Sequence, residues 1–299
     1  MTYCVAIRPD SGLVFLADSR TNAGVDQVST FRKLSVFERP GERVMVLMSA
    51  GNLALSQAVR SLLSEGISET EGVWAAPTMF DAARRVGEAV REVYRREAHI
   101  LQAHDVSFNI SLLLGGQIGQ ERCRLFQIYA AGNFIEASDE NVYFQIGESK
   151  YGKPILDRLA NRHSSVDDAA KCALLSMDST LRSNISVGMP LDLLVYEADS
   201  LRLTRFASID ANNRYFRMLR TAWGDGLREL FDDMPEPAWS DPASPDALAP
   251  AGLSHEPVRA APSGHAVATL SVQTLAQSDS TRAPDPGDVT EDDGTPGPG

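Results

Sequence analysis

The hydrophobic positions along residues 1–235 follow two spacings, one typical of strands and one typical of helices. Short apolar runs rich in β-branched and aromatic residues predict strands at 3–7, 13–17, 32–37, 44–48, 108–115, 124–130, 135–137, 143–146, 191–197 and 201–206. Apolar residues three or four positions apart predict helices at 53–66, 78–104, 152–161, 166–181 and 214–231. Two blocks of strands with helices grouped between them favour the α+β class, with two antiparallel sheets packed together.

The first two strands are expected to form a hairpin. Residues 9–12 (PDSG) carry turn-forming side chains and separate the apolar runs 3–7 and 13–17. Because both runs are continuously apolar, we expect these strands to be buried on both faces. Residues 18–24 (DSRTNAG) are then predicted to leave the second strand as a polar loop.

The composition changes at Pro235. From there to the end, the chain holds eleven of its sixteen prolines, ten acidic residues and two basic ones, and so carries eight of the twelve net negative charges. Such a segment buries too little apolar surface to offset the entropy cost of ordering. We therefore predict one domain over 1–232 and a disordered acidic tail over 233–299. The tail's one apolar patch, 267–275, is either a short docking segment or an ordinary part of the tail.

Charge and cysteine usage exclude several classes of function. The net charge of −12, without a basic stripe, argues against nucleic acid binding. Residues 1–16 do not have the pattern of a signal peptide, and no apolar run approaches the ~20 residues that span a bilayer. Cys4, Cys123 and Cys172 are widely spaced, and the five histidines show no metal-binding pattern. We expect reduced core cysteines, a cytoplasmic location, no membrane partner, and neither a cofactor nor a metal.

Four residues supply the chemistry of an amide hydrolase. Removal of Met1 would make Thr2 the first residue, with an amino group of pKa near ~8 beside its own hydroxyl. Asp18 follows the second predicted strand, and Lys33 lies early in the next. Gly51 stands where a strand gives way to a helix, so its N–H is expected to point outward with the helix dipole behind it. Nucleophile, carboxylate, ammonium and backbone donor are together what amide hydrolysis needs.

These residues lie in stretches that resemble the proteasome β-subunit family of N-terminal-nucleophile hydrolases. The resemblance covers roughly 2–231 and is carried by 17–21 (ADSRT), by Lys33 and by 49–51 (SAG). It is particularly marked for the bacterial Anbu, or ancestral β-subunit, branch, through 18–26 (DSRTNAGVD), 30–33 (TFRK) and 146–154 (IGESKYGKP).

The resemblance implies a four-layer α/β/β/α sandwich, the Ntn-hydrolase fold, and a threonine peptidase whose nucleophile is Thr2. It assigns Asp18 and Lys33 to the catalytic site and Gly51 to the oxyanion hole. It also implies a homo-oligomer, either a ring or a stacked assembly, that acts on a peptide or protein substrate. Since no Walker A motif occurs, any ATPase that serves it would be a separate chain.

The second half of the site departs from the family pattern. Gly-Glu-Ser stands at 147–149 where Gly-Ser-Gly is usual, so Glu148 replaces a serine, and Asn184 stands where an aspartate is expected. The resemblance offers Ser149 and Ser186 as the remaining hydroxyls of the site. We interpret Glu148 as a structural or subunit-contact carboxylate rather than a general acid.

Three functions are open at this point. The first is a self-compartmentalising threonine protease. The second is an N-terminal-nucleophile amidase that acts on a small amide or a peptide conjugate, which needs the same site chemistry. The third is a non-catalytic oligomeric scaffold, in which Met1 is retained and Thr2 has no free amine.

Overall fold

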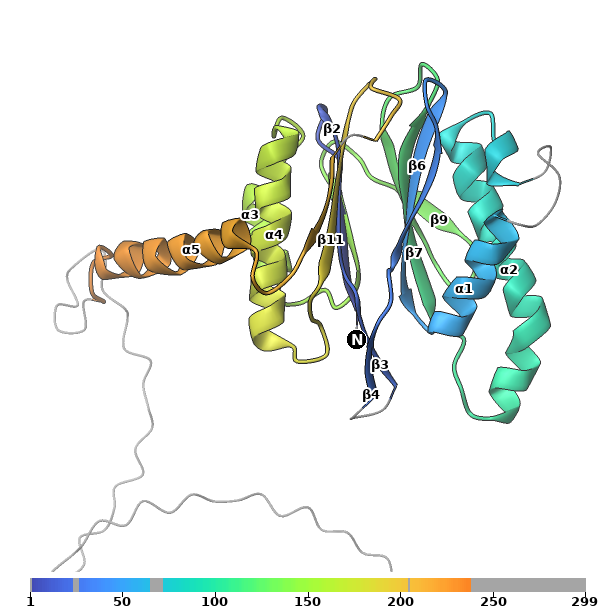
Figure 1. Ribbon diagram of the computed structural model, residues 1–299, viewed down its shortest axis with the longest axis horizontal. Coiled ribbons are helices and arrows are strands. Elements are labelled where there is room, and N and C mark those ends of the chain that lie inside the picture. The colour runs from blue at the N-terminus through green and yellow to red at the C-terminus, as the bar shows by residue number, and fades with distance from the viewer. Residues whose placement is uncertain (1, 24–26, 65–71, 204, 238–299) are drawn as a thin grey trace, which may run out of the picture. The chain divides into compact units, whose positions relative to one another are not determined.

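The computed structural model describes residues 2–23, 27–64, 72–203 and 205–237. These residues form two five-stranded antiparallel sheets and a two-stranded ribbon, with helices outside both sheets (Figure 1). The α/β/β/α layering confirms the fold that the resemblance implied. By its contacts the chain divides into Met1–Pro235 and Glu236–Gly299. The fold described here belongs to the first unit, and the tail from 233 onward, which falls almost wholly outside the described residues, stays a prediction.

The first sheet contains the predicted hairpin at its centre. Both hairpin strands are buried along their whole length, as their continuous apolar sequences predicted. The strand order is β10-β1-β2-β11-β12. In that order the strands cover Tyr143–Gly147, Tyr3–Ile7, Gly12–Asp18, Leu191–Glu197 and Arg205–Ile209.

The second sheet has the order β5-β6-β7-β8-β9. Its strands cover Leu34–Arg39, Arg43–Gly51, Ile110–Ile118, Arg124–Ile128 and Phe134–Glu136. On its outer face lie α1 (Leu53–Ser64), a 3-10 turn (Val73–Ala75) and α2 (Met79–Ala103) (Figure 1). The first sheet is covered by α3 (Lys153–Leu159) and α4 (Val166–Ser183), and α5 (Arg214–Asp232) follows β12. None of the described helices is long and apolar enough to cross a membrane.

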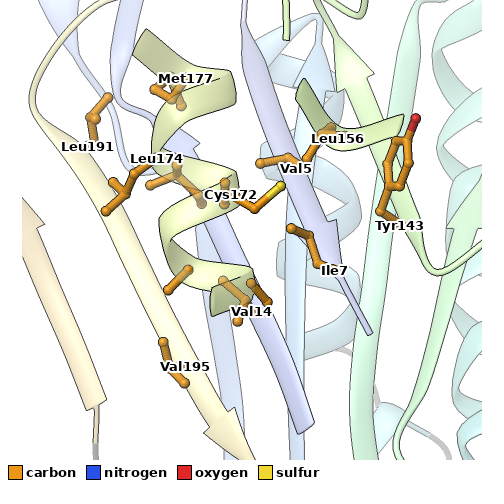
Figure 2. Packing of buried hydrophobic residues seen from close by; sticks show 14 of the residues in the cluster. Val5, Ile7, Val14, Tyr143, Leu156, Cys172, Leu174, Met177, Leu191 and Val195 are labelled. Atoms are coloured by element: carbon orange, nitrogen blue, oxygen red, sulfur yellow. The ribbon is translucent and has the colours of Figure 1, made fainter. Parts of the chain in front are cut away.

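Alternation along β1 divides its side chains between two cores. Val5 and Ile7 point toward the helices and pack with Leu174 and Met177 of α4 (Figure 2). Cys4, in contrast, faces the second sheet. A strand turns successive side chains to opposite faces, so a strand covered on both sides must be apolar throughout. Each such side chain contributes roughly 1.5–3 kcal/mol when fully buried.

The three cysteines are free and lie in this buried interior. Cys4 and Cys123 belong to the core between the sheets, whereas Cys172 belongs to the core under α4. Burial raises the pKa of the Cys123 thiol to about 12 and that of Cys172 to about 12. Their thiols are therefore held in the neutral form at ordinary pH.

Three sequence-based predictions of secondary structure need correction. The polar loop predicted at 18–24 is instead part of a ribbon in which β3 (Arg20–Ala23) pairs with β4 (Gln27–Thr30). That ribbon lacks the apolar alternation on which strand prediction depends. The strand predicted at 201–206 begins later, at Arg205, because the positive φ angles of Asp199 and Leu201, 64° and 43°, extend the preceding turn. The strand predicted from residue 32 begins at Leu34, which leaves Lys33 just before it.

Candidate active site

Antiparallel pairing brings Thr2 and Asp18 together although they are far apart in the sequence. Cys4 lies opposite Ala17, so the start of β1 lies beside the end of β2. On the other side of β1, Tyr3 lies opposite Gly147 at the end of β10. The start of β1 and the ends of β2 and β10 thus meet at one end of the first sheet. Thr2 and Asp18, the nucleophile and carboxylate suggested by the sequence, lie at this end.

A cleft of about 400 Å³ opens at this end of the sheet. Thr2, Lys33 and Gly51 line it, together with Asn109 and Ser111 at the start of β7. Thr2 is partly exposed, so a molecule in the cleft has access to it. Three of the four residues that the sequence suggested for amide hydrolysis therefore line one cleft.

Asp18, the fourth, lies beneath the cleft and holds the Lys33 ammonium. Lys33 Nζ donates hydrogen bonds to Asp18 Oδ1 at 2.7 Å and to the carbonyl oxygen of Arg20 at 2.7 Å. The Tyr3 N–H donates to the same carboxylate oxygen at 2.9 Å. Asp18 is fully buried, and Lys33 is 7% exposed. Burial raises the pKa of Asp18, while the charge and hydrogen bond of Lys33 and the N–H groups of Tyr3 and Gly188 lower it.

Gly51 and Gly147 line the cleft in backbone conformations that favour glycine. Their φ angles are +107° and +82°. A Cβ on Gly51 would lie 2.3 Å from the carbonyl oxygen of Asn109, and one on Gly147 would lie 2.1 Å from that of Thr2. Asn52 then caps α1, because its Oδ1 accepts the Ala54 N–H at 3.0 Å. The strand-to-helix junction predicted at Gly51 is confirmed, and its backbone is exposed to the cleft.

The second half of the predicted site lies beside the cleft. Ser149 is exposed and Ser186 is partly buried, and neither is among the described residues that line the cleft. Their backbone N–H groups donate to the side chains of Glu148 and Asn184, respectively. A catalytic role for either hydroxyl stays a prediction.

Two residues of the cleft wall, Asn109 and Ser111, had no signal in the sequence. Asn109 and Ser111 reach the cleft only because β7 pairs with β6, with Ser111 opposite Ala50. Arg20, which belongs to the 17–21 stretch that carries the resemblance, is held at the cleft by a hydrogen bond from its Nη1 to the carbonyl oxygen of Ile185 at 2.8 Å. A Cβ on Gly188 would lie 2.2 Å from that guanidinium, so the loop is fitted closely around Arg20. Cross-strand neighbours such as Ser111 follow from the register of the strands, which a linear sequence motif does not contain.

Comparison with known proteins agrees with this geometry. The model of the family described as proteasome subunit matches residues 2–195. No curated protein matches the chain.

Solved structures of Anbu proteins are similar over nearly their whole length. A Gly-1 mutant of Anbu from Hyphomicrobium sp. strain MC1 is 53% identical, with 79% of this chain and 99% of that chain covered and a TM-score of 0.74. Anbu from Yersinia bercovieri is 51% identical, with 78% and 97% covered and a TM-score of 0.73. The Anbu complex from Pseudomonas aeruginosa, described as a helical assembly, is 46% identical, with 79% and 98% covered and a TM-score of 0.76. The chain therefore belongs to the proteasome subunit family, among the Anbu, or ancestral β-subunit, proteins.

Proposed function

We propose that this protein is a cytoplasmic threonine peptidase whose nucleophile is Thr2, exposed by removal of Met1. The Thr2 hydroxyl attacks an amide carbonyl, and the Thr2 amine takes the hydroxyl proton, directly or through a water. Lys33 keeps that amine neutral through like-charge repulsion, which lowers its pKa. The Gly51 N–H stabilises the oxyanion, a contribution of about 3 kcal/mol per donor. The Thr2 ammonium gives that proton to the departing amine as the C–N bond breaks, and water then releases the acyl group from the Thr2 oxygen.

The buried ion pair between Lys33 and Asp18 is the observation that carries this proposal. Taking two charges out of water costs several kcal/mol, and buried ion pairs in proteins can often be replaced by apolar residues of similar volume without loss of stability. Here the pair is buried below a cleft that Thr2 lines. Charged groups held at such a cost beside an accessible nucleophile are typical of catalytic sites.

Intact-mass measurement tests the nucleophile. Protein with an untagged N-terminus is expected to lack Met1 and to gain one adduct, mapping to Thr2, on treatment with a threonine-reactive β-lactone. Thr2→Ala should gain no adduct, whereas Thr2→Ser should retain the reaction because it keeps the hydroxyl and the amine. Retained Met1 without an adduct would contradict the proposal and favour the scaffold function. If the adduct forms, substrate turnover separates the two enzyme functions. A peptidase should hydrolyse casein, whereas an amidase should hydrolyse only short amides.

We also infer that the protein assembles with copies of itself. The Pseudomonas aeruginosa relative is described as a helical assembly. In this chain, α5 is anchored at its start, where Phe216 is buried and Arg220 pairs with Asp178 of α4 at 2.5 Å. Its second half presents the exposed apolar residues Leu227, Leu230 and Phe231, and exposed Met234 follows just beyond the end of the helix. An apolar helix face of this kind supports contact with a second copy.

Charge placed on this face is expected to reduce the assembly. In Leu227→Glu/Phe231→Glu, the molar mass from light scattering should fall toward that of a monomer or a small oligomer, because two like charges would be buried at the contact. The residues are 47% and 75% exposed, so the fold should survive the changes. Glu229→Gln, on the same helix, is the control. An unchanged mass in the double variant would exclude this face as a contact surface.

A further inference from the structure

Three hydrogen-bond donors surround the Glu148 carboxylate. Its Oε1 accepts the backbone N–H groups of Ser149 at 2.9 Å and of Lys150 at 2.8 Å. Its Oε2 accepts Nδ2 of Asn184 at 2.8 Å. Burial opposes ionisation of this side chain, but the three donors and the positive charge of Lys150 together outweigh burial and lower the pKa of Glu148. Glu148 is therefore a buried, fully ionised hydrogen-bond acceptor.

Asn184 extends this contact to the loop that supports Asp18. Its Oδ1 accepts the Ser186 N–H at 3.0 Å, which fixes the amide with its nitrogen toward Glu148. Two residues farther along the loop, the Gly188 N–H lies 3.4 Å from Asp18 Oδ2. The loop that begins where α4 ends thus joins Glu148 to the carboxylate that holds Lys33.

Glu148 is also the backbone partner of the nucleophile. Its N–H donates to the Thr2 carbonyl oxygen at 2.7 Å. The positive φ of Gly147 allows the end of β10 to come this close. A path of hydrogen bonds therefore runs from Thr2 through Glu148 and Asn184 to the loop beside Asp18.

Resting on the function proposed above, we propose that Glu148 and Asn184 are a positioning pair for Thr2. The pair is an acid–amide hydrogen bond that locks the end of β10 and the 184–188 loop around the nucleophile. It also explains the two departures from the usual family pattern as one exchange. The usual pattern has a neutral serine at position 148 and an aspartate at position 184, whereas this chain has Glu148 and the neutral Asn184. One carboxylate is therefore kept, but it stands at the other position.

The pair works only when one member is a carboxylate. In Glu148→Gln, one acceptor oxygen would face three donors, so an N–H would be directed at another N–H. In Asn184→Asp, two carboxylates would face each other in a buried site. In the double variant Glu148→Gln/Asn184→Asp, the new amide would donate to the new carboxylate, whose other oxygen accepts the Ser186 N–H. The double variant therefore restores the hydrogen bond between the two side chains and the one from the Ser186 N–H, with the negative charge moved from position 148 to position 184.

A double-mutant cycle tests the pair. The rate of β-lactone adduct formation at Thr2 and the Tm are measured for the wild type, both single variants and the double variant. Each single variant should react at least about 10-fold more slowly, since a displacement of ~1 Å can cost about 10²-fold. Each should also lose on the order of 5 °C in Tm. The double variant should recover to within about threefold of the wild-type rate and regain most of the lost Tm. Glu140→Gln, an exposed change of the same kind, should alter neither quantity.

Failure of the pair and failure of the proposed function give different results. If the wild type reacts and the double variant is as slow as the product of the two single effects, the pair is excluded and the function stands. If the wild type forms no adduct, the proposed function fails, and the Tm values alone decide the pair. Recovery of Tm in the double variant would then support the hydrogen-bonded lock, and additive losses would overturn it.

Discussion

Replacing Lys33 by alanine is expected to reduce acylation of Thr2 by at least ~10³-fold, within the range that loss of acid–base catalysis produces. Without the ammonium, the Thr2 amine is protonated over a wider pH range, and a protonated amine accepts no proton from the hydroxyl. The rate of β-lactone adduct formation measures the loss. Lys171→Ala is the matched control, because it removes an exposed lysine of α4 that pairs with Asp168 at the surface. Retained acylation in Lys33→Ala would exclude the role proposed for Lys33.

The same substitution should make stability depend on pH. Asp18, which is fully buried in the wild type, loses the charge and the hydrogen bond that lower its pKa, so its folded-state pKa is expected to rise further above the unfolded value of about 3.9. A raised carboxyl pKa favours the folded state at acid pH, and that contribution is lost as pH rises through the folded-state pKa. We expect the Tm of Lys33→Ala to be closest to that of the wild type at acid pH. Near neutral pH, its free energy of unfolding should be lower than that of the wild type by about 3–5 kcal/mol. A difference in Tm that does not change with pH would indicate that Asp18 is not left charged.

Replacing Gly147 by alanine should displace the nucleophile. The new Cβ would lie 2.1 Å from the Thr2 carbonyl oxygen, in a residue whose φ is +82°. Backbone strain costs on the order of 1–3 kcal/mol. Because the clash is with Thr2 itself, acylation should also fall by about 10²-fold for each ~1 Å of displacement.

Gly41 separates strain from displacement. Its φ is +76°, and no described atom lies within 4 Å of the Cβ that alanine would add. Gly41→Ala should therefore lower Tm through backbone strain alone, by less than Gly147→Ala, and leave the acylation rate unchanged. A wild-type rate in Gly147→Ala would show that the reaction does not depend on the close approach of β10 to Thr2.

Much of the fold could be predicted from sequence because strands buried on two faces leave an unambiguous signal. The hairpin at 3–7 and 13–17 is the example, since each residue faces one of two cores. The β3–β4 ribbon was missed for the opposite reason, as its polar sequence matches the composition of a loop. The start of β12 depends on two residues with positive φ, which composition does not specify.

The site was predictable where its residues stand at element ends in a recognisable order. Thr2, Asp18 and Gly51 are of this kind. Residues that reach the site through register, such as Ser111, had no such signal. Glu148 and Asn184 were visible only as two separate departures, because the hydrogen bond that joins them spans 36 positions in the chain.

The burial of all three cysteines gives the folded protein no readily accessible thiolate. Electrophiles that modify the folded protein therefore meet no thiolate that competes with the Thr2 hydroxyl in the cleft. The same thiols become reporters once the structure opens. Cys172 marks the layer between α4 and the first sheet, and Cys4 marks the layer between the two sheets. The order in which they become reactive would record whether the helices separate from the sheet before the two sheets come apart.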